Sequence, residues 1–461
     1  MSTSRRGFLI NVTAGSALAQ PVRSAGAKPM NILYIHSHDS GRYLSPYGHA
    51  VPTPNLRRLA AEGVIFRRAF SAAPTCSPSR AALLTGQCPH QNGMLGLAHR
   101  GFSMTDYRHH MLHTLRGAGY LSVLAGLQHI ADKPERIGFD EVMKPRSTHA
   151  ADVAPQAVAF LDRRPSEPFF LDVGFQETHR EYPRPTDEDD PRYIQPPMPI
   201  PDTAETRWDM AGYHASARNL DRGVGQVLDA LARNGLADNT LVISTTDHGV
   251  AFPRMKCNLN DSGWGVSLIL RGPEIFRGGK VCDAMVSHLD VFPTLCDWLK
   301  IQPPAWLEGQ SLVGVLGGKD KEIHDEVFAE VNYHASYEPQ RAVRTQRYKY
   351  IKRFGGRTAP VLPNCDDSPS KTVWLEHGWR DRGQPVEELY DLIFDPGEQR
   401  NVATDRTTER VLEEMRRRLE AWMQRTNDPL LRGPVVAPAG AKVNPVDGVS
   451  PREPVVDASA K

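Results

Sequence analysis

Four short apolar runs, each followed by polar residues, constrain the fold of this chain more than any other feature. They span residues 31–36, 120–125, 169–175 and 240–246. Runs that are mostly apolar along their whole length are typical of strands buried on both faces. Segments with helical spacing lie between them, such as Pro54 to Glu62, which ends at Gly63. This alternation predicts an α/β fold with a large, mostly parallel sheet sandwiched by helices.

The pattern changes after about residue 325. Residues 327–331, 341–352 and 388–394 alternate between apolar and polar side chains, as half-buried antiparallel strands do. An amphipathic helix follows at 407–425. We therefore expect an α/β domain over residues 29–325 and a smaller C-terminal α+β subdomain over 326–432. Residues 433–461 are rich in Pro, Ala and Val without periodicity, and we expect a tail that is disordered or lies across the folded part.

The N-terminus has the features of an export signal. Arginines at positions 5 and 6 precede Gly-Phe-Leu-Ile, and Ala-Leu-Ala at 17–19 forms a small-x-small cleavage site. These features are typical of twin-arginine signals. We expect residues 1–28 to contain the export signal and to lie outside the fold, the twin-arginine translocase to be a partner, and the protein to be periplasmic or secreted from a bacterium. No stretch is long and apolar enough to span a bilayer, so no transmembrane span is expected.

Charge and cysteine content exclude several classes of protein. The 55 basic and 54 acidic residues leave a formal net charge of +1, so nucleic-acid binding through overall charge is not expected. An anionic substrate must instead be attracted by local cations. The six cysteines show no Cys-x-x-Cys spacing, which argues against a thiolate zinc site. Cys282 and Cys296 could form a disulfide in an oxidising compartment, although an even count does not establish one.

Two of the apolar runs end in histidine and aspartate. His38 and Asp39 follow the first run, and Asp247 and His248 follow residues 240–246. The carboxyl ends of parallel strands meet at one edge of a sheet, so these residues are expected to lie close together. Two carboxylates in such a position can hold a divalent cation. Taken alone, Asp-His-Gly after a strand is more often a turn with a helix cap, so both interpretations stay open at this point.

Residues 76–86 read Cys-Ser-Pro-Ser-Arg-Ala-Ala-Leu-Leu-Thr-Gly. A buried thiol before an ordinary helix start is one interpretation. However, Cys-x-Pro-x-Arg followed by Leu-Thr-Gly resembles the signature of the sulfatase family, with the eleven residues in order. The resemblance implies that a formylglycine-generating maturase oxidises Cys76 to formylglycine. The hydrated aldehyde has two hydroxyls, of which one attacks sulfur and the other, once deprotonated, collapses to the aldehyde and expels sulfate.

The resemblance covers roughly residues 30–430 and implies an alkaline-phosphatase-like fold with a metal site. It places His38, Asp39, Asp247 and His248, together with Cys76, around a divalent cation that is usually Ca²⁺. His38 stands where the family usually has its first aspartate, so an imidazole replaces an oxygen ligand. Because Ca²⁺ prefers oxygen and imidazole suits softer ions, the identity of the metal stays open.

The resemblance also implies roles for basic residues. Arg80, one helical turn from the cysteine, is expected to orient the aldehyde hydrate and neutralise developing charge. His129 and His179 are expected to act as acid and base near the leaving group, and Lys256 to bind sulfate. Arg180, directly after His179, is expected to pair with a carboxylate or sulfate of a bound sugar.

One position departs from the family pattern. Leu127 stands where sulfatases have the sulfate-contacting lysine of Gly-Lys-x-His, so a charge-assisted hydrogen bond is lost unless another cation replaces it. Within the family, residues 176–180 and 388–429 most resemble the N-sulfoglucosamine sulfohydrolase, or heparan N-sulfatase, type. This implies hydrolysis of a sulfate ester or N-sulfate on a sulfated carbohydrate. A neutral protein with a few convergent cations suits the end of a glycosaminoglycan fragment better than a long polyanion, which would favour an extended basic groove.

Two other functions remain open from the sequence. A phosphonate or phosphate-ester hydrolase of the same superfamily would use the same layout, since sulfur and phosphorus oxyanions are nearly the same size. A catalytically impaired protein that binds sulfated glycans is suggested by His38 and Leu127. Intact Cys76 and Arg80 argue against the second alternative, because a pure binding protein has no use for a maturation motif.

Overall fold

The computed structural model describes residues 30–458 with the exception of residue 167. The expected export signal therefore lies outside the described residues. None of the helices in the described part of the chain combines the length and apolar character that a membrane span requires.

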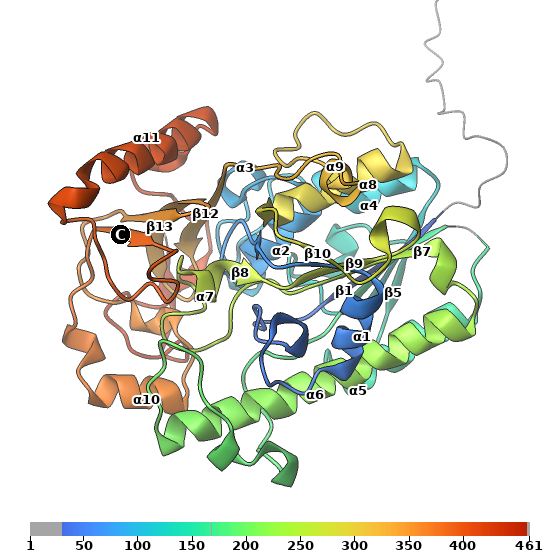
Figure 1. Cartoon of the computed structure of the whole chain (residues 1–461), viewed down its shortest axis with the longest axis horizontal. Helices are drawn as coiled ribbons and strands as arrows, with labels where there is room; N and C mark the ends of the chain where they lie inside the picture. The colour runs from blue at the N-terminus through green and yellow to red at the C-terminus, as the bar shows by residue number, and fades with distance from the viewer. Residues whose placement is uncertain (1–29, 167, 459–461) are drawn as a thin grey trace, which may run out of the picture.

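An eight-stranded, mostly parallel sheet forms the centre of the molecule (Figure 1), as the sequence predicted. Its strand order is β10-β2-β9-β7-β1-β6-β4-β5, and β1 pairs in parallel with both β6 and β7. Strand β9 runs antiparallel to its two neighbours. The bounds are β1 (Asn31–His36), β2 (Val64–Phe66), β4 (Leu121–Gly126), β5 (Glu141–Met143), β6 (Phe169–Gly174), β7 (Thr240–Thr245), β9 (Leu268–Arg271) and β10 (Lys280–Cys282).

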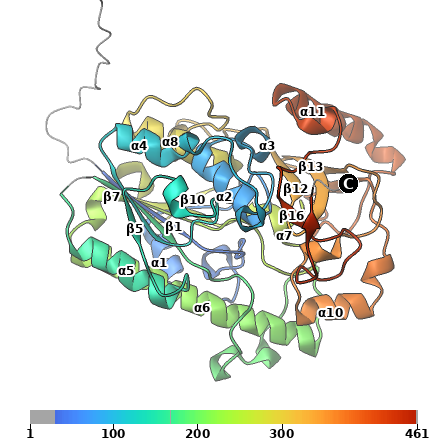
Figure 2. The same ribbon diagram turned by 180° about the vertical axis from the view of Figure 1, so that it is seen from behind.

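Helices cover both faces of this sheet (Figures 1 and 2). Alternate residues of β1 enter opposite cores, with Ile32 packing into one and Leu33 into the other. This explains the continuous apolar run, because neither face of the strand meets water. One face carries α1 (Pro54–Glu62), α5 (Ala150–Asp162) and α6 (Ala204–Arg233), and the other carries α2 (Cys76–Thr85), α4 (Met111–Gly117) and α8 (Val291–Leu299).

A four-stranded antiparallel sheet forms the smaller C-terminal part. Helix α11 (Glu409–Arg425) packs its apolar side, including Leu419, on one face of this sheet. The other face shares a core with Phe70 and Trp264 of the first part. The predicted run 341–352 is two strands, because the chain turns back at residues 346–347. The order follows the sequence: β12 (Glu326–Tyr333), β13 (Tyr337–Thr345), β14 (Tyr348–Arg353) and β15 (Glu387–Asp391).

Of the two courses expected for the tail, residues 433–458 follow the second, since they are ordered and lie across the folded part. Val435 and Ala441 are buried in the core that also contains α2 and α4. Two short strands, β16 (Lys442–Val443) and β17 (Val456–Asp457), pair with each other. The segment lacks periodicity because single apolar side chains and side-chain hydrogen bonds hold it, and not a long helix or strand.

Candidate active site

Cys76 is the first residue of α2, and its side chain is almost completely buried. The N-terminus of a helix carries partial positive charge, so a group at this position that becomes negative is stabilised. Burial raises the pKa of the Cys76 thiol well above its ordinary value, which keeps the unmodified thiol neutral and weakly nucleophilic. All six cysteines are free thiols, so the bridge considered between Cys282 and Cys296 is not formed.

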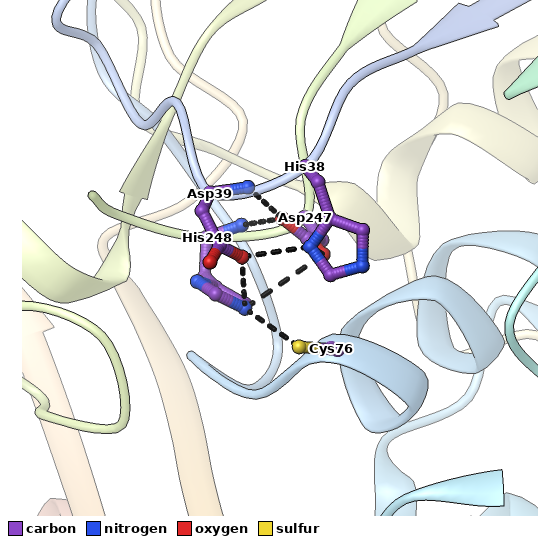
Figure 3. A group of neighbouring side chains, drawn as sticks. All are labelled: His38, Asp39, Cys76, Asp247 and His248. Carbon is purple, nitrogen blue, oxygen red and sulfur yellow. Dashed lines mark hydrogen bonds and ion pairs between the residues drawn. The ribbon is translucent and has the colours of Figure 1, made fainter. Parts of the chain in front are cut away.

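Four side chains from the ends of two neighbouring strands converge on Cys76 (Figure 3). His38 and Asp39 follow β1, and Asp247 and His248 follow β7, which pairs in parallel with β1. His38 Nδ1 lies 2.7 Å from Asp39 Oδ1 and 3.1 Å from Asp247 Oδ2. His248 Nε2 lies 3.3 Å from Asp39 Oδ1 and 3.3 Å from Cys76 Sγ. The structure thus brings together all five residues predicted to bind the metal.

The donor atoms of this cluster fit a divalent cation. They lie within 4.8 Å of one another, and all five residues are buried. Metal–ligand distances of about 2.0–2.4 Å place neighbouring ligands about 3–4 Å apart, which matches the separations above. Two buried carboxylates this close together also repel each other, and a cation between them removes that cost.

Arg80 and Lys256 hold the two carboxylates in their ionised form. Arg80 Nη2 lies 2.9 Å from Asp247 Oδ2, and Lys256 Nζ lies 2.9 Å from Asp39 Oδ2. Burial alone would raise the pKa of both carboxyls, but these cations and the nearby histidines hold each pKa well below its usual range. Burial lowers the pKa of His38 to about 4, so its ring is neutral at pH 7 and Nδ1 can present a lone pair.

Lys256 places a second positive charge beside the cluster. Its Nζ lies 2.9 Å from Asp366 Oδ2 and 3.4 Å from Nε2 of His179, which stands in the loop after β6. Burial would lower the pKa of Lys256, but Asp366 and Asp39 raise it well above its ordinary value. Lys256 therefore stays an ammonium ion next to the nucleophile and can attract an oxyanion.

His129 contacts the cluster through His38 and has no hydrogen bond with Cys76. Its Nδ1 lies 3.3 Å from His38 Nε2, and its Nε2 lies 3.1 Å from His99 Nδ1. The rings of His99 and His129 stack on each other. The imidazoles of His38, His129 and His99 therefore form a row from the cluster to the exposed His99. Leu127, two residues before His129, contributes no cation.

Arg180 is not available to a substrate in this structure. Its two terminal nitrogens bond to the Asp209 carboxylate at 2.6 and 2.8 Å, and its Nε donates to the Ala251 carbonyl. The guanidinium also lies over the rings of Tyr182 and Phe252. The expected pairing with a substrate carboxylate or sulfate is therefore not met, because the carboxylate of Asp209 on α6 already accepts from both terminal nitrogens of the guanidinium. The residues around Arg180 in the sequence gave no indication of this distant partner.

Two residues that the sequence did not indicate reach the site from the C-terminal part. His334, just after β12, is buried with its Nε2 3.8 Å from Cys76 Sγ. Asp366 pairs with Lys256, and although burial would raise the pKa of this carboxyl, Lys256 and His179 hold it below its usual range. Neither lies in a motif. The only available signal was a histidine directly after a predicted strand, as at His38.

Comparison with known proteins identifies the class to which this fold and site belong. The Sulfatase family model matches residues 30–301, and a model described as N-sulphoglucosamine sulphohydrolase, C-terminal, matches residues 255–370. The first match spans more than half of the chain, so the chain belongs to the sulfatase family.

Individual relatives are similar over nearly their whole length. The chain is 30% identical to N-sulphoglucosamine sulphohydrolase of Homo sapiens, over 92% of this chain and 95% of that protein. It is 29% identical to an ulvan-active sulfatase of Formosa agariphila, over 94% of this chain and 89% of that protein. The solved structure of a 2-O GAG sulfatase has the same fold, with a TM-score of 0.70 at 23% identity over 92% of this chain and all of that one.

Family membership makes this chain a sulfuric ester hydrolase with an α/β fold of the sulfatase and alkaline-phosphatase type. It also implies a metal ion and a formylglycine, for which the cluster around Cys76 supplies a fitting set of donors.

Proposed function

We propose that this protein is an exported sulfatase that removes sulfate from a sulfated sugar through a formylglycine made from Cys76. The observation that carries the proposal is the convergence of Cys76 with two carboxylates and two imidazoles at one sheet edge. When present, the formylglycine would supply the hydroxyl that attacks sulfur. We further propose a maturase and the twin-arginine translocase as partners during biosynthesis, and a periplasmic or secreted location.

His38, Asp39, Asp247 and His248 would hold the cation. The family implies Ca²⁺, but two imidazole nitrogens in the donor set favour a softer ion such as Zn²⁺. His38→Asp would restore a hard oxygen ligand, so this variant is expected to bind Ca²⁺ more tightly than the wild type. Calorimetric titration of metal-free protein with Ca²⁺ and with Zn²⁺ measures both affinities. An unchanged Ca²⁺ affinity would place His38 outside the ligand set.

The remaining polar residues would bind and orient the sulfate and its leaving group. Lys256 is the fixed positive charge beside the nucleophile, and His179 lies within 3.4 Å of it. We assign sulfate binding to Lys256 and proton transfer near the leaving group to His179 and His129. Arg80 is bound to Asp247 and to the Ser37 carbonyl, so it acts on the nucleophile by fixing the metal-binding carboxylate.

We propose the terminal unit of a glycosaminoglycan fragment as substrate, with the N-sulfate of glucosamine as the first candidate. The similarity to N-sulphoglucosamine sulphohydrolase supports this choice. A cavity of about 320 Å³ that includes His179 and Arg222 in its lining supports it as well, since this volume suits one sugar unit and not a long polyanion. Arg222 on α6 takes the substrate-binding role first expected of Arg180.

Sulfate release from a matched substrate panel tests the proposal. The panel pairs N-sulfoglucosamine with a sugar O-sulfate, an aryl sulfate, an aryl phosphate and a phosphonate monoester. The Cys76→Ala protein is the control, because it keeps the other four residues of the cluster. Faster turnover of sulfated sugars than of phosphorus esters supports the proposal. Preference for phosphorus esters would favour the phosphonate or phosphate-ester hydrolase, and binding without turnover would favour the glycan-binding protein.

A further inference from the structure

We propose that His334 is a further catalytic residue, which donates a hydrogen bond to the nucleophile or to the sulfate on it, and that the C-terminal tail positions it. This inference rests on the proposed function, and it adds a residue of the C-terminal part to the same site. The tail segment concerned is residues 441–453, named here the tail clasp.

The imidazole of His334 is directed at the reacting position. Its Nε2 lies 3.8 Å from Cys76 Sγ, the atom that stands where a formylglycine oxygen would be. Its Nδ1 has no hydrogen-bond partner among the described residues, and the residue is 5% exposed. Nδ1 therefore meets no donor or acceptor among these residues, and Nε2, the nitrogen that faces Cys76, can carry the proton of the neutral ring and donate it.

Cys76 lies between two imidazoles from different parts of the chain. His248 Nε2 is 3.3 Å away on one side and belongs to the metal-binding set. His334 approaches from the C-terminal part and is outside that set. With the metal bound to His248, His334 is the imidazole that remains able to donate a hydrogen bond to an oxygen at this position.

The tail clasp holds the backbone directly after His334. Asn444 is almost completely buried, its N–H donates to the Ala335 carbonyl at 2.7 Å, and its carbonyl accepts from Ser336 Oγ at 2.9 Å. Arg100 ties the two segments together, because its Nη1 donates both to Ala335 O and to Asn444 Oδ1. The clasp therefore fixes both residues that follow His334.

The same contacts extend to the other residue that the C-terminal part contributes. Ser336 N–H donates to Asn364 Oδ1 at 2.8 Å, and Asn364 lies two residues before Asp366. Asp366 in turn pairs with Lys256. Movement of the clasp would therefore displace His334 and Asp366 together, and would leave the metal-binding residues in place.

Four variants test the proposal. His334→Ala removes the donor, and His334→Gln keeps an N–H near the position of Nε2. Asn444→Ala removes the side-chain bonds of the clasp to Arg100 and to the Glu453 carbonyl. Lys442→Ala is the matched control, because Lys442 lies in the same tail segment but its ammonium group, within the described part of the chain, pairs with Asp457 alone at the surface.

We expect His334→Ala to lower kcat/KM by about 10²–10³-fold, and His334→Gln to recover at least about tenfold. Asn444→Ala is expected to lower kcat by about tenfold, and Lys442→Ala by less than about twofold. The mass of the Cys76 peptide and the melting temperature should match those of the wild type in each protein. Loss of activity that follows unconverted Cys76, or equal losses in His334→Ala and His334→Gln, would overturn the proposal.

Binding of inorganic sulfate separates this inference from the proposed function. Calorimetry on the wild type and His334→Ala requires no turnover, and a Kd about tenfold weaker in the variant is expected. If the wild type binds sulfate through His334 but hydrolyses no sulfated sugar, the proposed function fails while this inference stands. Equal Kd values in the two proteins would contradict the inference.

Discussion

The active site has two walls, one formed at the ends of strands β1 and β7 and one by residues of the C-terminal part, and they are built in different ways. On one wall, each pair of functional residues is adjacent in the sequence and leaves a buried strand at the same sheet edge, as His38 with Asp39 does after β1. On the other wall, His334 and Asp366 stand alone in the sequence and are held by hydrogen bonds from the tail clasp and Asn364. The first wall therefore carries the carboxylates proposed to bind the metal, and the second carries the groups proposed to contact the sulfate at Cys76.

This difference indicates how each wall should respond to mutation. The two carboxylates of the first wall each have a cationic partner at 2.9 Å, so removal of one carboxylate leaves a buried cation without that partner. On the second wall, the backbone after His334 is held by hydrogen bonds of the tail clasp, and a neutral hydrogen bond contributes about 1 kcal/mol. The predictions below begin with the nucleophile that lies between the two walls.

The nucleophile should give the largest effect. Cys76→Ala is expected to abolish turnover and to leave the fold and metal content near those of the wild type, because the group is chemical and not structural. Cys76→Ser should release at most one desulfated product molecule per enzyme molecule and keep the sulfate on the serine, since a sulfated serine has no second hydroxyl with which to collapse. Single-turnover and steady-state assays of the desulfated product distinguish the two variants. Sustained turnover by either variant would refute the formylglycine mechanism.

Loss of a metal-binding carboxylate should come next. Asp247→Ala removes a ligand and leaves Arg80 without its partner, so metal content and activity should fall together, with kcat lower by about a thousandfold or more. Elemental analysis of the purified protein measures the first effect, and sulfate release the second. Full activity in a protein with no stoichiometric divalent ion would show that the cluster does not hold a catalytic metal.

Arg180 should affect stability more than recognition. Arg180→Ala leaves Asp209 as a buried unpaired acid, which is expected to cost about 3–5 kcal/mol of unfolding free energy. Asp209 also accepts from Ser370 Oγ, so this pair joins the two parts of the molecule. Denaturant unfolding measures the loss, and the double variant with Asp209→Ala should recover part of it. A stable Arg180→Ala protein that loses affinity for sugars but not for aryl sulfates would restore the first expectation.

The smallest effect concerns an ion pair of the C-terminal part. Burial by itself raises the pKa of Glu330, but His90 and Arg341 lower it from 4.5 to about 2. A depressed carboxyl pKa contributes stability above the ordinary value, and that contribution is lost as pH falls from about 4.5 to about 2. The unfolding midpoint of the wild type should therefore drop more steeply over this range than that of Glu330→Gln. Parallel curves would show that this carboxyl is not linked to folding.

The sequence predicted the central sheet and most of the first wall. Strand β1 was placed at its observed bounds because all six of its residues are buried, and the cluster could be assembled because strand ends carry its residues. The second wall could not be predicted, since the contact between Cys76 and His334 joins positions 258 residues apart with no local pattern. For the same reason the Asp209 partner of Arg180 was missed, and the sequence left open whether the tail is ordered. Both depend on single side chains meeting across the fold.

The mass of the peptide that contains Cys76, from protein made in its native host, tests the central claim most directly. The account predicts a peptide in which the CH₂SH side chain has been replaced by an aldehyde or its hydrate, and it predicts that sulfate release rises in proportion to the converted fraction. A fully active protein whose Cys76 peptide retains the unmodified thiol would contradict it.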